Sequence, residues 1–87
     1  IQQAVRKDLG KPVAEVNLSE IYPVVSEINH IIAHLDDWSR PVKVDAPLSM
    51  LGTRSEIRYE PRGVCLIIAP WNFPFMLAMG PLVSCLA

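Results

Sequence analysis

The sequence lacks an excess of charge of either sign, and it contains almost no cysteine. Among 87 residues, eight are Lys or Arg and nine are Asp or Glu, so the formal net charge is −1. A near-neutral chain without a run of basic residues gives no electrostatic reason to expect binding to nucleic acid or to a membrane surface. The two cysteines, Cys65 and Cys85, are too few for a disulfide framework and have no metal-ligand spacing. We expect both to be reduced thiols, buried as small apolar side chains.

Targeting signals are also missing. The chain begins with Ile-Gln-Gln rather than with a charged segment followed by an apolar one, so no signal peptide is predicted. The absence of an initiator methionine suggests that the native start lies upstream, and we expect a cytoplasmic protein. An 87-residue domain on its own buries only roughly 60–65% of its unfolded surface, so it would be marginally stable without further protein.

Charge is absent altogether from residue 63 to residue 87, a length that could cross a bilayer. Five residues that break or bend helices interrupt this stretch: Pro70, Asn72, Pro74, Gly80 and Pro81. They would leave backbone groups without hydrogen bonds inside a membrane. We therefore expect no membrane span, and burial of the stretch in a protein core instead.

Two helices are expected in the N-terminal part. The first covers residues 1–9 and ends at Gly10-Lys11-Pro12, because Gly favours the left-handed conformation after a helix and Pro cannot continue it. The second begins between residues 14 and 18, contains Pro23 as a kink or first-turn residue, and ends at Trp38. Its apolar stripe is wider than a coiled-coil seam, which favours packing on a globular body: Leu18, Ile21, Val24, Val25, Ile28, Ile31, Ile32, Leu35 and Trp38.

A possible metal pair lies on the same helix. His30 and His34 are four residues apart, a spacing that can bind a metal ion from one helix face. No convincing third ligand accompanies them, so we expect ordinary surface histidines and no metal site.

The remaining sequence alternates between strands and turns before a last helix. Short exposed strands are predicted at residues 42–44 and 54–59, and a turn at residues 60–63. The apolar, β-branched run 64–69 is typical of a strand buried on both faces of a parallel sheet. Residues 75–87 predict a buried helix, bent at Gly80-Pro81. A strand, a turn and a helix are the first parts of a βαβ unit whose second strand is missing, so the expected class is α/β.

The turn between that strand and helix carries the most distinctive residues. Pro70-Trp71-Asn72-Phe73-Pro74 is stiff, and Asn72 is placed to cap the following helix, with Pro74 tolerable in a first turn. A turn at the carboxyl end of a parallel strand is also where α/β proteins present groups to a ligand. Asn72 is therefore either a helix cap, an amide donor to a ligand, or both.

Two motifs closely resemble the aldehyde dehydrogenase superfamily. The stronger one is Glu60-Pro61-x-Gly63-Val64 followed by Ile68-x-Pro70-Trp71-Asn72-Phe73-Pro74, and the weaker one is Asp8-Leu9-Gly10-Lys11-Pro12. Their separation is most similar to the class 3, or fatty aldehyde, branch. The resemblance covers nearly the whole chain but only an N-terminal fraction of a family member. It implies N-terminal helices at 1–41, a loop and oligomerisation-arm strands at 42–62, and the start of a Rossmann-like NAD(P)-binding domain at 63–87.

The resemblance also implies a function. A family member oxidises an aldehyde to a carboxylic acid with NAD or NADP and forms a homo-oligomer. It implies that Asn72 is the oxyanion-hole amide, and that four residues line the cofactor cleft: Ile68, Ala69, Pro70 and Trp71. The nucleophilic Cys, the general-base Glu and the cofactor-contacting Lys of the family lie beyond Ala87, and neither Cys65 nor Cys85 matches the catalytic Cys. We therefore expect the chain alone to be inactive.

One alternative of a different class stays open. In this alternative, the chain is a non-enzymatic remnant or a small interaction protein that binds a partner helix through the apolar stripe at residues 18–35.

Overall fold

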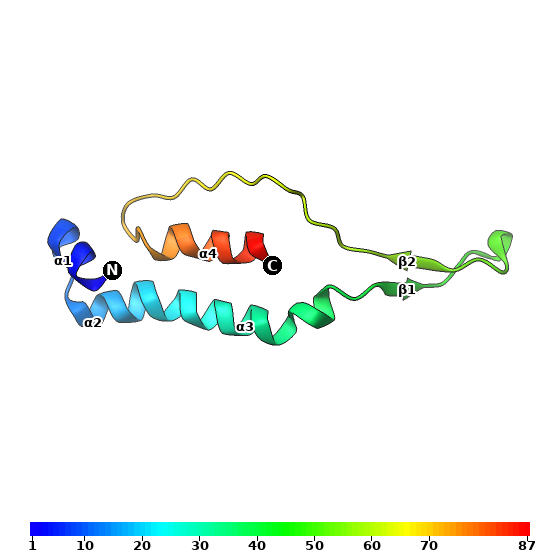
Figure 1. Cartoon of the computed structure of the whole chain (residues 1–87), viewed down its shortest axis with the longest axis horizontal. Helices are drawn as coiled ribbons and strands as arrows, with labels where there is room; N and C mark the ends of the chain where they lie inside the picture. Colours follow the sequence, from blue (N-terminus) through cyan, green and yellow to red (C-terminus); the bar gives the residue numbers. More distant parts are fainter.

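The structure, a computed structural model that describes all 87 residues, has a helical part at one end and a β-hairpin at the other (Figure 1). Its extents are 65 × 24 × 15 Å and its radius of gyration is 19.7 Å. A compact domain of this length has a radius of gyration of about 12 Å. The chain is therefore elongated, and most of its side chains are at least partly exposed.

The first helix, α1 (Gln2–Leu9), ends as the sequence predicts. Gly10 follows it with φ 70°, in the left-handed region, and its N–H donates to the carbonyl of Arg6. This conformation suits glycine because it has no Cβ. The prediction of a helix that stops at Gly10 is confirmed.

The predicted second helix is confirmed as one continuous helical rod. It consists of α2 (Val13–Val16), a π-helical turn η1 (Asn17–Ile21) and α3 (Tyr22–Trp38). In the π turn, the N–H of Tyr22 donates to the carbonyl of Asn17, five residues back. We attribute this wider turn to Pro23, which lacks an N–H and whose ring would clash with the carbonyl four residues earlier in a regular α-helix.

The last helix, α4 (Met76–Leu86), lies beside α3 and runs in the same direction (Figure 1). Val24 and Ile31 of α3 are buried, and Val16 and Val5 extend this small core toward the N-terminus. The opposite edge of the apolar stripe faces solvent, since Leu18 and Ile32 are each 72% exposed. The stripe therefore packs on one side only.

The hairpin consists of β1 (Val42–Val44) and β2 (Ser55–Ile57), paired antiparallel with Lys43 opposite Glu56. A 3-10 turn, η2 (Leu48–Met50), lies in the connecting loop. Both predicted strands are confirmed, although the second is shorter than residues 54–59. Figure 1 shows the hairpin projecting away from the helices.

The prediction of a buried strand at residues 64–69 is wrong for this chain. The segment is extended but pairs with no other strand, because the single sheet contains only β1 and β2. Val64 is 100% exposed, and Leu66 and Ile68 are 85% and 86% exposed. A strand needs a neighbour to accept and donate its backbone hydrogen bonds, and no other segment of the chain lies alongside to do so.

Helix α4 is also less covered than the sequence predicts. It forms as expected and continues through Gly80 and Pro81, but none of its residues is buried, because only α3 and the adjoining turn η1 pack against it. No helix of the chain has both the length and the apolar character needed to cross a membrane.

Candidate functional site

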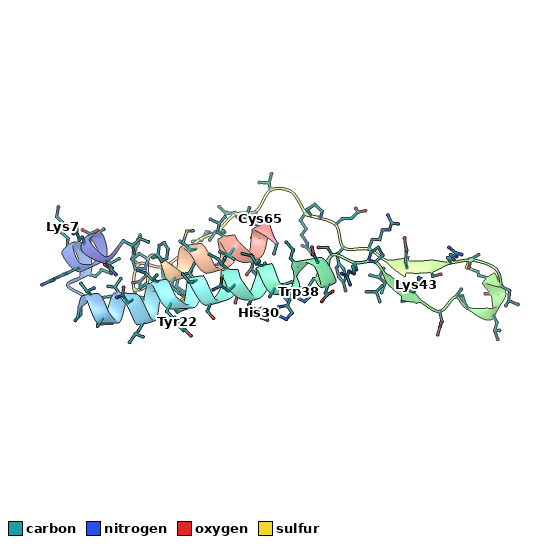
Figure 2. All side chains as sticks on the ribbon, turned by 60° about the horizontal axis from the view of Figure 1, so that its bottom comes forward. Lys7, Tyr22, His30, Trp38, Lys43 and Cys65 are labelled. Atoms are coloured by element: carbon teal, nitrogen blue, oxygen red, sulfur yellow. The ribbon has the colours of Figure 1, made fainter.

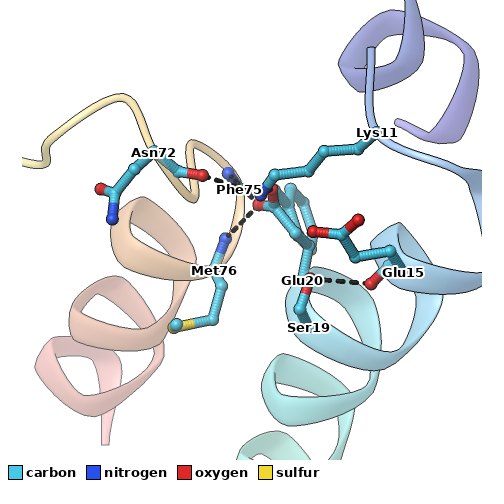
Figure 3. A network of polar contacts seen from close by, with 7 residues as sticks. All are labelled: Lys11, Glu15, Ser19, Glu20, Asn72, Phe75 and Met76. Carbon is cyan, nitrogen blue, oxygen red and sulfur yellow. Dashed lines mark hydrogen bonds and ion pairs between the residues drawn. The ribbon is translucent and has the colours of Figure 1, made fainter. Parts of the chain in front are cut away.

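A buried carboxylate joins the N-terminal helices to the start of α4 (Figure 3). The side chain of Glu20, in η1, has no solvent exposure. Its Oε2 accepts hydrogen bonds from the backbone N–H groups of Phe75 at 2.9 Å and Met76 at 3.2 Å. Its Oε1 accepts one from Nζ of Lys11 at 2.9 Å. Both oxygens are thus occupied.

Glu20 performs the task that the sequence assigns to Asn72. The first N–H groups of a helix have no partner within it, and the positive end of the helix dipole favours an anion there. Phe75, the residue before α4, makes no side-chain capping bond, and the Asn72 side chain makes no hydrogen bond to the chain. The prediction that Asn72 caps this helix is therefore wrong, because the carboxylate of Glu20, 55 residues before Phe75, binds these donors.

Lys11 connects this cap to the turn. Its Nζ donates to the backbone carbonyl of Asn72 at 2.7 Å as well as to Glu20, and it lies 3.8 Å from the ring centroid of Phe73. Gly10 and Pro12 flank Lys11, so the short link between α1 and α2 directs this side chain toward the turn. The Lys11 side chain is only 13% exposed, which strengthens its charged contacts.

The environment of Glu20 favours its ionised form. Burial acts to raise the pKa of Glu20, but hydrogen bonds from Lys11, Phe75 and Met76, together with the Lys11 charge, outweigh it. The pKa of Glu20 therefore lies below its ordinary value of 4.5. The carboxylate stays charged at neutral pH, as the contact with Lys11 requires.

This lowered pKa predicts an acid-sensitive attachment of α4. The unfolded state binds the Glu20 proton at higher pH than the folded state, so Glu20 stabilises the fold above its ordinary pKa of 4.5. That contribution falls as the pH drops from 4.5 through the lower pKa of the folded state. We expect amide exchange at Phe75 and Met76 to accelerate over this range, in excess of the intrinsic pH effect on exchange. Glu20→Gln is the control, because it lacks this titration, and equal acid sensitivity of the two proteins would contradict the prediction.

The predicted site residues lie along the segment that leads into this turn. Ile68, Pro70, Trp71 and Asn72 are exposed and Ala69 is half-buried. Figure 3 shows the Asn72 side chain directed away from Lys11 and Glu20, while its backbone carbonyl faces Lys11. A hollow of about 930 Å³, lined by α3, the end of α4 and the segment from Tyr59 to Cys65, includes none of these residues in its lining. Four of the five residues are therefore open to solvent, and none of the five lines this hollow.

Sequence reasoning missed both Glu20 and Lys11 as members of the site. A signal for Glu20 exists, since it occupies an apolar row of the helix with Val16, Val24 and Ile31, all of which are buried. A carboxylate in such a row must find partners or lose its charge. Lys11 lies inside the Asp8–Pro12 motif, but the sequence does not reveal what it contacts.

The histidine pair is exposed, as expected. The rings of His30 and His34 are 4.3 Å apart between centroids, and Trp38 stacks on His34 at 5.6 Å. His30 is exposed on α3 (Figure 2), while Trp38 also lines the hollow between α3 and the end of α4. The chain contains no group of three or more His, Cys, Asp or Glu side chains arranged to hold a metal ion.

The two cysteines are exposed, so the expectation that they are buried is wrong. The extended segment that carries Cys65 and the helix that carries Cys85 have no covering layer in this chain. The Cys65 thiol raises the pKa of Cys85, first through a thiol–thiol hydrogen bond, then through desolvation and charge repulsion. A nucleophilic cysteine needs the opposite shift, so this environment does not activate Cys85.

The aldehyde dehydrogenase family model matches residues 1–87. Over all 87 residues the chain is 42% identical to aldehyde dehydrogenase family 3 comG of Dictyostelium discoideum and 42% identical to the putative aldehyde dehydrogenase AldX of Bacillus subtilis. It spans 18% and 19% of those two proteins.

A solved structure is similar as well. The substrate-bound state of Staphylococcus aureus AldH matches 95% of this chain with a TM-score of 0.90 and 38% sequence identity. The match covers 18% of that protein. The chain thus spans less than a fifth of the length of these relatives.

Proposed function

Because this chain belongs to the aldehyde dehydrogenase family and has the fold of its N-terminal segment, we propose that it is part of a longer NAD(P)-dependent enzyme that oxidises an aldehyde to a carboxylic acid. In this proposal the chain contributes the Asn72 amide and one wall of the cofactor site. The observation that supports it most is the Asn72 turn itself. Its backbone is bound by Lys11, while its side-chain amide is exposed and makes no hydrogen bond within the chain.

Such an amide suits the chemistry of aldehyde oxidation. Attack of a thiolate on the aldehyde carbonyl forms a carbon–sulfur bond and moves an electron pair to the carbonyl oxygen. The Asn72 amide N–H then donates to this oxygen and stabilises its negative charge. Because the amide is neutral, it does not bind the oxygen as a permanent ion pair, and the charge can return to the carbonyl when hydride leaves.

The residues before Asn72 fit one wall of a cofactor site. Ile68 and Trp71 are 86% and 85% exposed, and with Ala69 and Pro70 they form an uncharged surface next to the amide. When bound, NAD or NADP would accept the hydride that leaves the aldehyde carbon. Side chains that would distinguish the two cofactors do not occur on this surface.

The nucleophile comes from elsewhere in our proposal. Neither thiol of this chain matches the family's catalytic Cys, and Cys65 raises rather than lowers the pKa of Cys85. We therefore expect the 87-residue chain to be inactive by itself. The exposed hairpin of β1 and β2, which leaves backbone groups unpaired at its edges, supports a homo-oligomer of the longer enzyme.

An activity assay tests this proposal. The purified 87-residue chain and the longer polypeptide that contains it are each given short aliphatic, long aliphatic and aromatic aldehydes with NAD or NADP, and NAD(P)H fluorescence is followed. We expect aldehyde-dependent signal only from the longer polypeptide. Turnover by the chain alone would contradict its dependence on further residues, and no turnover by the longer polypeptide with any aldehyde would contradict the enzyme assignment.

A second candidate function is a helical interaction module without enzyme activity. The exposed row of Leu18, Val25 and Ile32 supports it, since their exposed fractions are 72%, 47% and 72%. In that case, binding to a partner helix would depend on these three side chains and be indifferent to Asn72.

A further inference from the structure

We propose that Lys11 and Glu20 are positioning residues that fix the Asn72 turn, so that the Asn72 amide meets the reacting oxygen in one orientation. This inference rests on the proposed function of Asn72 and assigns a role to two residues outside the cofactor segment. Neither residue touches substrate or cofactor in this proposal, and both act through the backbone of residues 72–76.

The contacts hold the turn at both of its ends. Lys11 binds the entry side, through the Asn72 carbonyl at 2.7 Å and the Phe73 ring at 3.8 Å. Glu20 binds the exit side, through the N–H groups of Phe75 and Met76. The ion pair of 2.9 Å between Lys11 and Glu20 joins the two halves. The turn is thus bracketed by two side chains that precede it by more than fifty residues.

The entry side has no other attachment. Of residues 64–72, only Asn72 has a backbone hydrogen bond within the chain, and that bond comes from Lys11. The extended segment before it is open to solvent, with Trp71 85% exposed. Without Lys11, the peptide unit that follows the Asn72 α-carbon would lose its one fixed point in this chain.

The network is buried and complete, which makes it rigid. Glu20 has no exposed side-chain surface and Lys11 has 13%, and no buried side-chain nitrogen or oxygen of the chain lacks a partner. Charge-assisted hydrogen bonds in such surroundings are short and strong, and a fully satisfied network specifies one geometry.

The direction of the Asn72 side chain follows from this anchoring. Its carbonyl points toward Lys11 and its side chain points to the opposite side (Figure 3). Both groups leave the same α-carbon, so rotation of the backbone there would redirect the amide. A displacement of about 1 Å of a group at a reacting centre can lower a rate by about a hundredfold.

The test is a double-mutant cycle in the longer polypeptide, with Lys11→Met, Asn72→Ala and the combination. Methionine keeps an apolar side chain of similar length over Phe73 but cannot donate to the Asn72 carbonyl. We expect Lys11→Met to lower kcat roughly tenfold to a hundredfold with little change in KM. Lys11→Met should cause no further loss once Asn72 is alanine, because it acts through that amide. Lys7→Met is the matched control, since Lys7 is exposed on α1 and has no ion pair, and its kcat should not change.

A second variant keeps the test decisive if Lys11→Met does not fold. Glu20→Gln retains an oxygen that can accept from Phe75 and Met76, but its amide cannot pair with the Lys11 ammonium. We expect a smaller loss of kcat than for Lys11→Met, again absent when Asn72 is alanine. Glu15→Gln is its control, because Glu15 is exposed on α2 and makes no ion pair. Melting temperatures and elution volumes identify variants that have lost their fold.

The outcomes separate this inference from the function on which it rests. If kcat is unchanged in a folded Lys11→Met or Glu20→Gln, or if its loss is the same with and without Asn72, the positioning role is overturned while the oxyanion role stands. If Asn72→Ala itself leaves kcat unchanged, the oxyanion role fails, and the positioning role fails with it.

Discussion

Replacing Asn72 with alanine in the longer enzyme is expected to lower kcat by about 10²–10³-fold, which corresponds to about 2.7–4 kcal/mol of transition-state stabilisation. The carbonyl oxygen gains its charge only after thiolate attack, so the lost interaction belongs to the transition state rather than to substrate binding. KM should therefore change far less than kcat. The measurement is initial rates over a range of aldehyde concentrations at saturating cofactor.

Asn29→Ala provides the comparison for this variant. Asn29 is exposed on α3 and its side chain makes no hydrogen bond. Asn29→Ala is therefore the same substitution at a position that does not contact the turn. Its kcat should equal that of the unaltered enzyme. A large rise in KM at constant kcat for Asn72→Ala would assign this residue to substrate binding instead.

Replacing Glu20 with alanine is expected to have the largest effect on stability, about 3–5 kcal/mol. The change leaves the largely buried ammonium of Lys11 without its carboxylate, and it removes the acceptor of two N–H groups at the start of α4. A buried charge that loses its partner is costly because water cannot replace the lost interaction. Urea unfolding of the longer polypeptide measures the loss, and exchange at the Phe75 and Met76 amides shows whether it arises at α4.

The comparison for Glu20 is Glu15→Ala, one helical turn earlier but exposed. Surface substitutions of this kind usually change stability by less than about 0.5 kcal/mol. A loss below about 1 kcal/mol for Glu20→Ala would mean that the carboxylate behaves as a surface charge, and that the apolar contact between α3 and α4 holds the two helices together by itself.

Local sequence signals were sufficient for most of the secondary structure. Gly10 ends α1 and Pro12 precedes α2, because each residue restricts its own backbone wherever it occurs. The hairpin strands at 42–44 and 55–57 are likewise found within or at the predicted segments. These helix ends and strands are determined by residues that are adjacent in sequence, so they can be predicted without the structure.

The errors concern features that depend on distant residues. The run at 64–69 has the composition of a buried strand, but pairing needs a second strand that no segment of this chain supplies. Asn72 has the right position to cap α4, yet Glu20 takes the cap because its carboxylate carries a full charge and is held beside the helix start by Lys11. Capping preference alone contains no information about a competitor more than fifty residues away.

The candidate site likewise contains residues that the sequence reveals and residues that only the structure reveals. The sequence reveals the motif Pro70-Trp71-Asn72-Phe73-Pro74 because its residues are contiguous. The roles of these residues in catalysis and cofactor binding are part of our proposal. The hydrogen-bond network next to this motif joins Lys11 in the link between α1 and α2, Glu20 in η1, and Phe75 at the start of α4. Only the position of Glu20 in an apolar row hints at it, because a charged residue there demands compensation.

The unpaired segment at residues 64–69 has a consequence for the behaviour of this polypeptide in solution. Val-Cys-Leu-Ile-Ile-Ala carries no charge and no proline, and both of its edges are open. Six-residue segments of this composition stack readily into the interlocked sheets of amyloid when they are left exposed. Arg62 on one side and Pro70 on the other interrupt such stacking at its borders, as gatekeeper residues do. In the longer enzyme that we propose, strands paired with this segment would protect the protein from self-aggregation as well as complete a sheet.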